Sequence, residues 1–263
     1  LHSLRRRQRQ MCIRDSIFPE QQSGCRYGGK SLMSRPSSGF GLIELMVALA
    51  LGLMVVLGLT QVFLSSRETY LSQRSSALLQ EDARYVLSKM AQEIRMVGMF
   101  GCLSIDRIID APPVFQTPVS WQGGSGSKSL HMISADLGFQ AAKPDWTVVS
   151  DCTTTARAYP GMQLPLAPGE TSFRLRELFY RFENGQLRSG PGNAVLLDNV
   201  AAFDVSFGVA GSSSTQSIVR YEDRPANASS IRSVRIGLTL RDPEGRVRDQ
   251  VYHLVVALRN RLV

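Results

Sequence analysis

The sequence predicts an α+β protein in which one long N-terminal helix, apolar in its first half and amphipathic in its second, packs on an antiparallel β-sheet head. Three observations predict this class. Residues 40–64 form an apolar run with a single ionisable side chain, Glu44. No proline separates this run from an amphipathic pattern that continues to about Val97. From residue 98 onward, alternating apolar residues and turn sequences indicate strands.

Composition excludes several classes of protein. The chain has 263 residues, of which 43% are apolar and 20% charged, so it is neither disordered nor collagen-like. Its formal net charge of +8 is unevenly placed, because residues 1–39 hold eight of the 30 Lys and Arg residues but two of the 22 Asp and Glu residues. Residues 40–263 therefore carry only +2. A nucleic-acid partner is not expected, since it would need a basic stripe with exposed aromatic residues.

The first 32 residues have no apolar periodicity and hold an arginine cluster that no core would accept. The segment RRRQRQMCIRDS within them resembles a translation of sequencing-adapter read-through. We therefore expect residues 1–32 to be a non-native start, with Met33 as the natural one. Residues 33–39 would then be a short polar leader containing Arg35.

This start also contains the spacing of a phosphate-binding loop, formed by Gly24, Gly29, Lys30 and Ser31. Such a loop needs a strand before it and a helix after it, so that backbone N–H groups face the phosphates. Neither flank is present, because a polar segment precedes it and Pro36 follows it closely. We do not interpret the spacing as a nucleotide site.

Residues 40–64 are long enough to span a membrane. At about 1.5 Å per residue, a helix of this length exceeds the roughly 30 Å hydrocarbon core. A cleaved secretory signal would be shorter and would close with a small-x-small site, which is missing before Arg67. A plain anchor would not explain Glu44, because an unpartnered carboxylate at membrane depth costs about 2.5 kcal/mol or more.

The residues Gly39, Phe40 and Glu44, in the order Gly-Phe-x-x-x-Glu, resemble the class III signal of type IV pilins and type II secretion pseudopilins. This resemblance implies that a prepilin peptidase cuts between Gly39 and Phe40 and methylates the new amino group of Phe40. The apolar run lies after the cut and is kept.

Charge compensation follows from the spacing of this motif. The new α-amino group of Phe40 and the carboxylate of Glu44 are four residues apart, which places them on one helical face. The cation and the carboxylate can compensate in a low-dielectric setting within one subunit or, as the resemblance implies, between a new subunit and its neighbour in the filament. Glu44 is therefore the predicted assembly residue.

Residues 65–97 are predicted to be the amphipathic half of the same helix. Apolar residues recur at steps of four and three, and charged residues occupy the other faces. The apolar positions are Leu79, Ala83, Leu87, Met90, Ile94 and Val97.

Residues 98–263 are predicted to form a β-rich head outside the cytoplasm. The loop segments are 112–113, 123–129 and 211–214. Hairpins are expected around Asn184-Gly185 and around residues 242–245, and a further strand contains Val200, Phe203, Val205 and Phe207. We expect an antiparallel sheet of four or more strands on the amphipathic half of the helix.

Cys102 and Cys152 are the two cysteines outside the suspect start. In an oxidising compartment a structural disulfide is favoured over two free thiols. It would close a loop of about 50 residues and contribute about 4 kcal/mol.

The chain also resembles the PilW subgroup of minor type IV pilins. This resemblance is carried by residues 39–53, SSRETY, RMVGMFGC, SADLG and the terminal VALRNRL. It implies a pilin-like ladle and a minor pilin that takes part in pilus assembly through a priming or tip complex, and thereby in twitching motility or adhesion. The implied partners are the prepilin peptidase, other minor and major pilins and the inner membrane, which the chain crosses once with its head in the periplasm until assembly moves it to the cell surface.

Two alternatives stay open. A type II secretion pseudopilin carries the same signal. A membrane-anchored hydrolase is the remote alternative, because His131 and His253 sit in strand-like runs and neither a G-x-S-x-G nor an H-E-x-x-H motif is present. We expect no enzyme activity, no catalytic residue, no cofactor, no metal and no small-molecule substrate.

Overall fold

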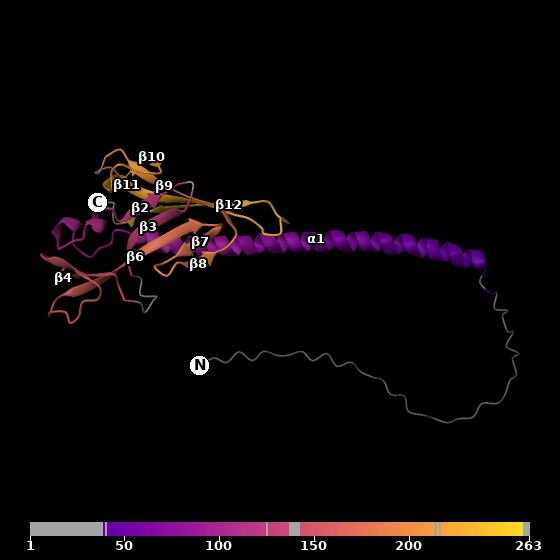
Figure 1. Ribbon diagram of the computed structural model, residues 1–263, viewed down its shortest axis with the longest axis horizontal. Helices are drawn as coiled ribbons and strands as arrows, with labels where there is room; N and C mark the ends of the chain where they lie inside the picture. The colour runs from indigo at the N-terminus through magenta and orange to yellow at the C-terminus, as the bar shows by residue number, and fades with distance from the viewer. Residues whose placement is uncertain are drawn as a thin grey trace, which may run out of the picture. The chain divides into compact units, whose positions relative to one another are not determined.

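The computed structural model describes residues 39, 41–124, 126–136, 143–212, 215 and 217–259. The chain divides between Val56 and Leu57 into two units. Helix α1, Leu42–Arg95, runs through this boundary as 54 residues without a break (Figure 1). It ends at Arg95, two residues before the predicted end, because Gly98 turns with φ of 73° and Val97 forms an isolated bridge with Ser134.

The described residues of the head form two sheets. The larger has eight strands: β1 (Ile108–Ile109), β2 (Val119–Gln122), β3 (Lys128–Ala135), β4 (Trp146–Ser150), β5 (Ala156–Pro160), β6 (Thr171–Glu183), β7 (Gln186–Ser189) and β8 (Ala194–Leu197). The smaller has four: β9 (Val200–Ala210), β10 (Ile218–Glu222), β11 (Ile231–Leu240) and β12 (Gln250–Ala257). In the described part of the head, three short 3₁₀ helices occupy the connections: η1 (Ile105–Arg107), η2 (Pro113–Gln116) and η3 (Ala228–Ser230).

The strand order of the larger sheet is β1-β5-β4-β6-β3-β2, with β7 paired to both β6 and β8. The smaller sheet has the order β10-β9-β11-β12. All pairs are antiparallel except β1 with β5. The α+β class with an antiparallel sheet head is therefore confirmed, and the structure adds that the head has two sheets, one of which has a parallel edge pair.

Two buried clusters hold the head together. The helix-side core joins α1 to both sheets and includes Met90, Met132 and Phe203. The far-side core lies on the other face of the larger sheet and includes Phe115 and Ile133. Strand β3 therefore has no solvent face over its central residues, since Met132 faces one core and Ile133 the other.

The second half of α1 buries one face against the head. Its buried apolar residues are Leu79, Ala83, Val86, Met90, Ala91 and Ile94. Five of the six predicted positions are buried, since Val97, directly after α1, is buried as well. Leu87 is half-buried, and the buried face also includes Ala91 and Val86, of which Val86 has no exposed surface. The spacing of three and four residues keeps these side chains on one stripe.

Both predicted hairpins are present. Asn184 and Gly185 join β6 to β7 as a two-residue loop, with φ of 51° and 75° and Glu183 paired to Gln186. Positive φ at both positions is the requirement of a type I′ turn. The second hairpin joins β11 to β12 through residues 241–249, where the Gly245 N–H donates to the Asp242 carbonyl at 3.1 Å.

Candidate functional site

The signal residues lie at the start of α1. Gly39 is exposed, Phe40 lies outside the described residues, and the Leu45 N–H donates to the Gly41 carbonyl at 3.2 Å in the first helical turn. Glu44 is the acidic residue of this turn and is exposed. A carboxylate is favoured there, because the N-terminus of a helix carries a partial positive charge.

The first half of α1 is a continuous exposed apolar surface. Every described residue from 41 to 70 is exposed, including 16 large apolar residues between Leu42 and Leu64. In the described part of the chain, α1 is the one helix long and apolar enough to cross a membrane, with a mean hydropathy of 2.6 over its most apolar 18 residues. Exposed apolar surface of this extent marks a membrane or protein contact.

A polar cluster lies where the second half of α1 meets β6. The half-buried carboxylate of Glu93 accepts hydrogen bonds from the Lys89 ammonium and the Tyr180 hydroxyl. The Ser134 hydroxyl donates to the Glu93 carbonyl at 3.1 Å. Burial, and after it the charge of Glu93, raises the pKa of Tyr180, so this hydroxyl stays protonated.

This cluster borders a cavity of about 700 Å³ between α1 and the larger sheet. Its walls carry the aromatic rings of Tyr85 and Phe179 and charges of both signs, including Arg84 and Glu177. No local sequence pattern marks this cavity, because its residues come from segments of the chain about 90 residues apart.

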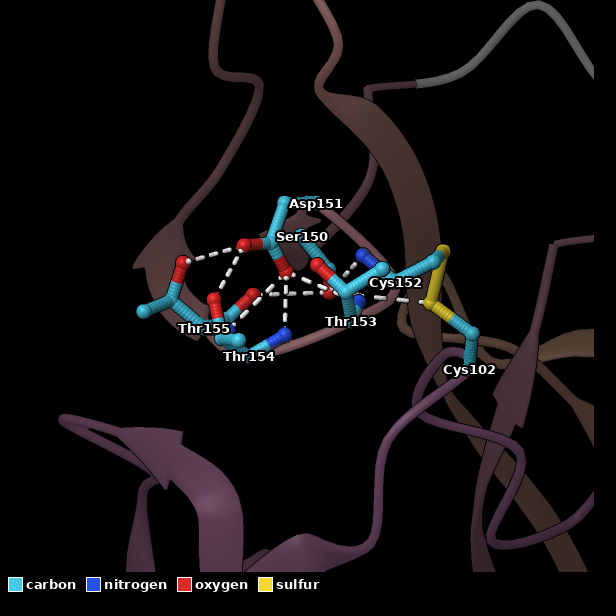
Figure 2. Close-up of a disulfide and its surroundings, with 7 residues drawn as sticks. All are labelled: Cys102, Ser150, Asp151, Cys152, Thr153, Thr154 and Thr155. Atoms are coloured by element: carbon cyan, nitrogen blue, oxygen red, sulfur yellow. Dashed lines mark hydrogen bonds between the residues drawn. A yellow bond between two sulfur atoms is a disulfide. The ribbon is translucent and has the colours of Figure 1, made fainter.

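Cys102 and Cys152 form a disulfide with their Cα atoms 5.3 Å apart (Figure 2). The bond joins the segment after α1 to the β4–β5 connection across 50 residues. Next to it, the Ser150 hydroxyl oxygen accepts the Cys152 N–H at 2.9 Å and its O–H donates to the Thr155 carbonyl at 2.8 Å.

The turn after β4 is held by Asp151 (Figure 2). Its carboxylate accepts the Thr154 hydroxyl at 2.6 Å and the backbone N–H groups of Thr153, Thr154 and Thr155 at 2.9 Å each. The Thr154 hydroxyl, followed by the backbone donors, holds the pKa of Asp151 well below its usual range. These contacts fix the loop in which Cys152 lies, with its φ of 59°.

The residues considered for hydrolysis do not converge. His131 lies on β3, stacked on Phe179 with ring centroids 4.6 Å apart, and its Nε2 is 2.6 Å from Glu177 Oε1. His253 is exposed on β12 in the other sheet. Among the residues that the structure describes, no three His, Cys, Asp or Glu side chains are grouped as a metal site would require.

The comparisons with known proteins identify the N-terminal segment. Residues 34–60 match the family model described as the prokaryotic N-terminal methylation motif, and this range contains Gly39, Phe40 and Glu44. No curated protein and no solved structure matches the chain. The motif implies processing by a prepilin peptidase and association with pilins, and with the apolar helix it fits membrane anchoring. The methylation motif, the long helix α1 and the β-sheet head together support the interpretation that this is a type IV pilin-like protein with a structural role rather than an enzyme.

Proposed function

We propose that the protein is a minor pilin of the PilW subgroup that primes type IV pilus assembly as part of a tip complex. The observation that carries this proposal is the position of Gly39, Phe40 and Glu44 inside the matched motif, directly before an exposed apolar helix. Before assembly the chain would cross the inner membrane once, with its head in the periplasm. After assembly it would lie in the pilus with other minor and major pilins.

The processing step creates the charge that assembly uses. Cleavage between Gly39 and Phe40 leaves a cationic amine, and methylation keeps that amine basic. Glu44 lies four residues further, within one helical turn, so its carboxylate pairs with a Phe40 amine of the same or a neighbouring subunit. Apolar helices slide past one another with little preference, so a charge pair between subunits sets their register.

The substitution Glu44→Ala tests this role in a strain that lacks the native gene. We expect intact-mass analysis to show a cleaved and methylated Phe40, while the amount of the variant in sheared surface pili falls at least tenfold. Glu68→Ala is the matched control, because Glu68 is also an exposed acidic residue of α1 but follows the apolar run. Normal incorporation of the Glu44→Ala variant would disprove the assembly role.

The same deletion strain separates a minor pilin from a secretion pseudopilin. Loss of surface pili with normal enzyme secretion supports the proposal. Loss of secretion with normal pili would assign the chain to a type II secretion system instead.

A further inference from the structure

Two arginines lie directly opposite each other where β6 pairs with β7. Arg181 of β6 is the register partner of Arg188 of β7. The neighbouring residues Tyr180 and Leu187 are buried in the helix-side core, and side chains alternate along a strand, so both arginines point to the opposite face of the sheet. Like charges directly opposite on paired strands are destabilising. In the absence of an anion, this pair therefore lowers the stability of the sheet.

No carboxylate of the described residues compensates these two charges. The ion pairs between described residues include neither Arg181 nor Arg188. They do include four other arginines of the head, namely Arg157, Arg220, Arg241 and Arg246. Glu183 lies on the same face, two residues from Arg181, but it is exposed and forms no ion pair with either arginine. Both guanidinium groups therefore keep their positive charge.

Amide oxygens hold the two guanidinium groups in place instead. Arg188 Nε and Nη2 donate to Gln186 Oε1 at 3.1 and 2.6 Å. Gln186 Nε2 in turn donates to Asp198 Oδ1 at 2.7 Å, which fixes the orientation of the glutamine. Arg181 Nη1 donates to Asn193 Oδ1 at 3.5 Å. A neutral acceptor orients an arginine without cancelling its charge. Within the described part of the chain, the other N–H groups of both arginines have no further acceptor and can donate to a ligand.

Both arginines line a small pocket of about 150 Å³. Its other walls are Phe179 and the turn after β7, with Gly190, Pro191 and Asn193. The backbone fixes this turn, because the Asn193 N–H donates to the Gly190 carbonyl at 3.1 Å and the Gly190 N–H donates to the Phe179 carbonyl at 3.0 Å. The volume lies below the about 300 Å³ at which pockets for drug-sized molecules begin. The pocket therefore suits a small anion or a single charged group.

We propose that Arg181 and Arg188 bind a tetrahedral oxyanion of the phosphate or sulfate class. The planar fork of a guanidinium group matches two oxygens of such an anion, and the two arginines can each supply one fork. A carboxylate has two oxygens, which one arginine satisfies, so it would leave the second charge uncompensated. A dianion compensates both charges and removes the repulsion between the strands. Its binding should therefore stabilise the folded head.

Equilibrium dialysis of the detergent-solubilised full chain against radiolabelled inorganic phosphate tests the site. At an ionic strength kept constant with sodium chloride, we expect saturable binding that sulfate displaces. Arg181→Gln and Arg188→Gln should each weaken it by about tenfold or more, the effect of losing one charge-assisted hydrogen bond. Arg174→Gln is the matched control, because Arg174 is also an exposed arginine of β6 but lies on the other face of the strand. This control should bind phosphate as the wild type does.

Urea unfolding of the same variants separates a binding role from a structural one. Without phosphate, Arg181→Gln should be at least as stable as the wild type, because the like-charge contact is removed. With phosphate, the wild type should gain stability and the variant should not. If Arg181 only supported the fold, the variant would be less stable in both buffers and phosphate would stabilise both chains equally. That result would overturn the proposal.

Three further outcomes of the dialysis would overturn the proposal: no saturable binding, an equal loss of binding in Arg174→Gln, and displacement by acetate as strong as displacement by sulfate, which would indicate a carboxylate site. Displacement by glycerol 3-phosphate distinguishes two sources of the same chemistry. Stronger displacement than by unlabelled phosphate indicates a phosphate group on a larger molecule, weaker displacement indicates the free anion, and both support the site. None of these measurements depends on the processing of Phe40, so this proposal and the proposed function can fail separately.

Discussion

At the scale of single residues, the Tyr180 hydroxyl donates a hydrogen bond to the half-buried carboxylate of Glu93. Glu93 accepts from this hydroxyl and from Lys89. Removing one partner of a buried hydrogen bond leaves the other with its desolvation penalty. The contact between Tyr180 and Glu93 joins residues 87 positions apart, so no local sequence pattern predicts it.

We expect Tyr180→Phe to lower the free energy of unfolding by about 1–3 kcal/mol, because Glu93 loses a donor. Urea unfolding of the detergent-solubilised chain, followed by tryptophan fluorescence, measures it. Tyr85→Phe is the control, since the Tyr85 side chain is largely exposed. Equal losses from the two variants would contradict the role of the hydroxyl.

The lowered pKa of Asp151 makes the free energy of unfolding depend on pH in the acidic range. Its pKa is lowered by the Thr154 hydroxyl and the backbone donors of the turn. Its contribution is therefore complete above its unfolded pKa of about 3.9 and is lost as the pH falls from there toward the folded pKa. Asp151→Asn should be less stable than the wild type at pH 7, and the difference should shrink below about pH 4. Urea unfolding at several pH values measures the difference, and an equal gap at pH 7 and pH 2 would refute the prediction.

At the scale of elements, the second half of α1 packs into the helix-side core together with residues of both sheets. Met90 lies in the middle of its buried stripe with no exposed surface. The helix-side core to which Met90 belongs also contains residues of both sheets, including Leu187 and Phe203. A truncation at this position therefore leaves a cavity that no single element can close.

Met90→Ala should cost about 2–5 kcal/mol of the free energy of unfolding. Gln92→Ala, at an exposed position of the same helix turn, should stay within about 0.5 kcal/mol of the wild type. Trp121 reports on this core, because its ring packs edge-on against Phe203 at 5.7 Å. An unchanged fluorescence midpoint for Met90→Ala would show that α1 is not part of the cooperative unit.

Elements whose signals are local could be predicted from the sequence. The periodicity from Leu79 to Ile94 and the Asn184-Gly185 turn each occupy a short stretch, and both are present as expected. Val86 was not predicted to be buried, because the pattern of apolar residues was assigned to the helix row that contains Leu87 and not to the neighbouring row. The processing motif could be identified for the same reason, because Gly39, Phe40 and Glu44 lie within six consecutive positions. The roles of these residues stay predictions.

At the scale of the whole molecule, strand pairing could not be predicted. The parallel pairing of β1 with β5 connects residues about 48 positions apart, and the division into two sheets depends on partners that alternating patterns do not specify. Both sheets nevertheless share the helix-side core, while the far-side core has its own residues and its own tryptophan reporter, Trp146, 5.9 Å from Phe115.

The disulfide lies beside the far-side core and acts on the whole head. Replacing Cys102 and Cys152 together by Ser should lower the free energy of unfolding by about 4 kcal/mol, because the 50-residue loop is then open in the unfolded chain. Urea unfolding followed by tryptophan fluorescence measures it, and the wild type with its disulfide reduced should show the same loss. A change below about 1 kcal/mol would mean that the loop is held by its other contacts.

The two-sided burial of β3 changes what determines its alignment. In a sheet with one wet face, a slip by one residue exposes apolar side chains and is penalised by water. In β3 such a slip would only exchange Met132 and Ile133 between two apolar cores. The hydrophobic effect alone therefore discriminates weakly between the two alignments of the strand. The polar residues of β3 therefore determine its alignment. In one alignment only, the Ser134 hydroxyl donates to the Glu93 carbonyl and the His131 ring lies beside the Glu177 carboxylate. A few polar contacts thus determine the register of a strand whose two faces are both apolar.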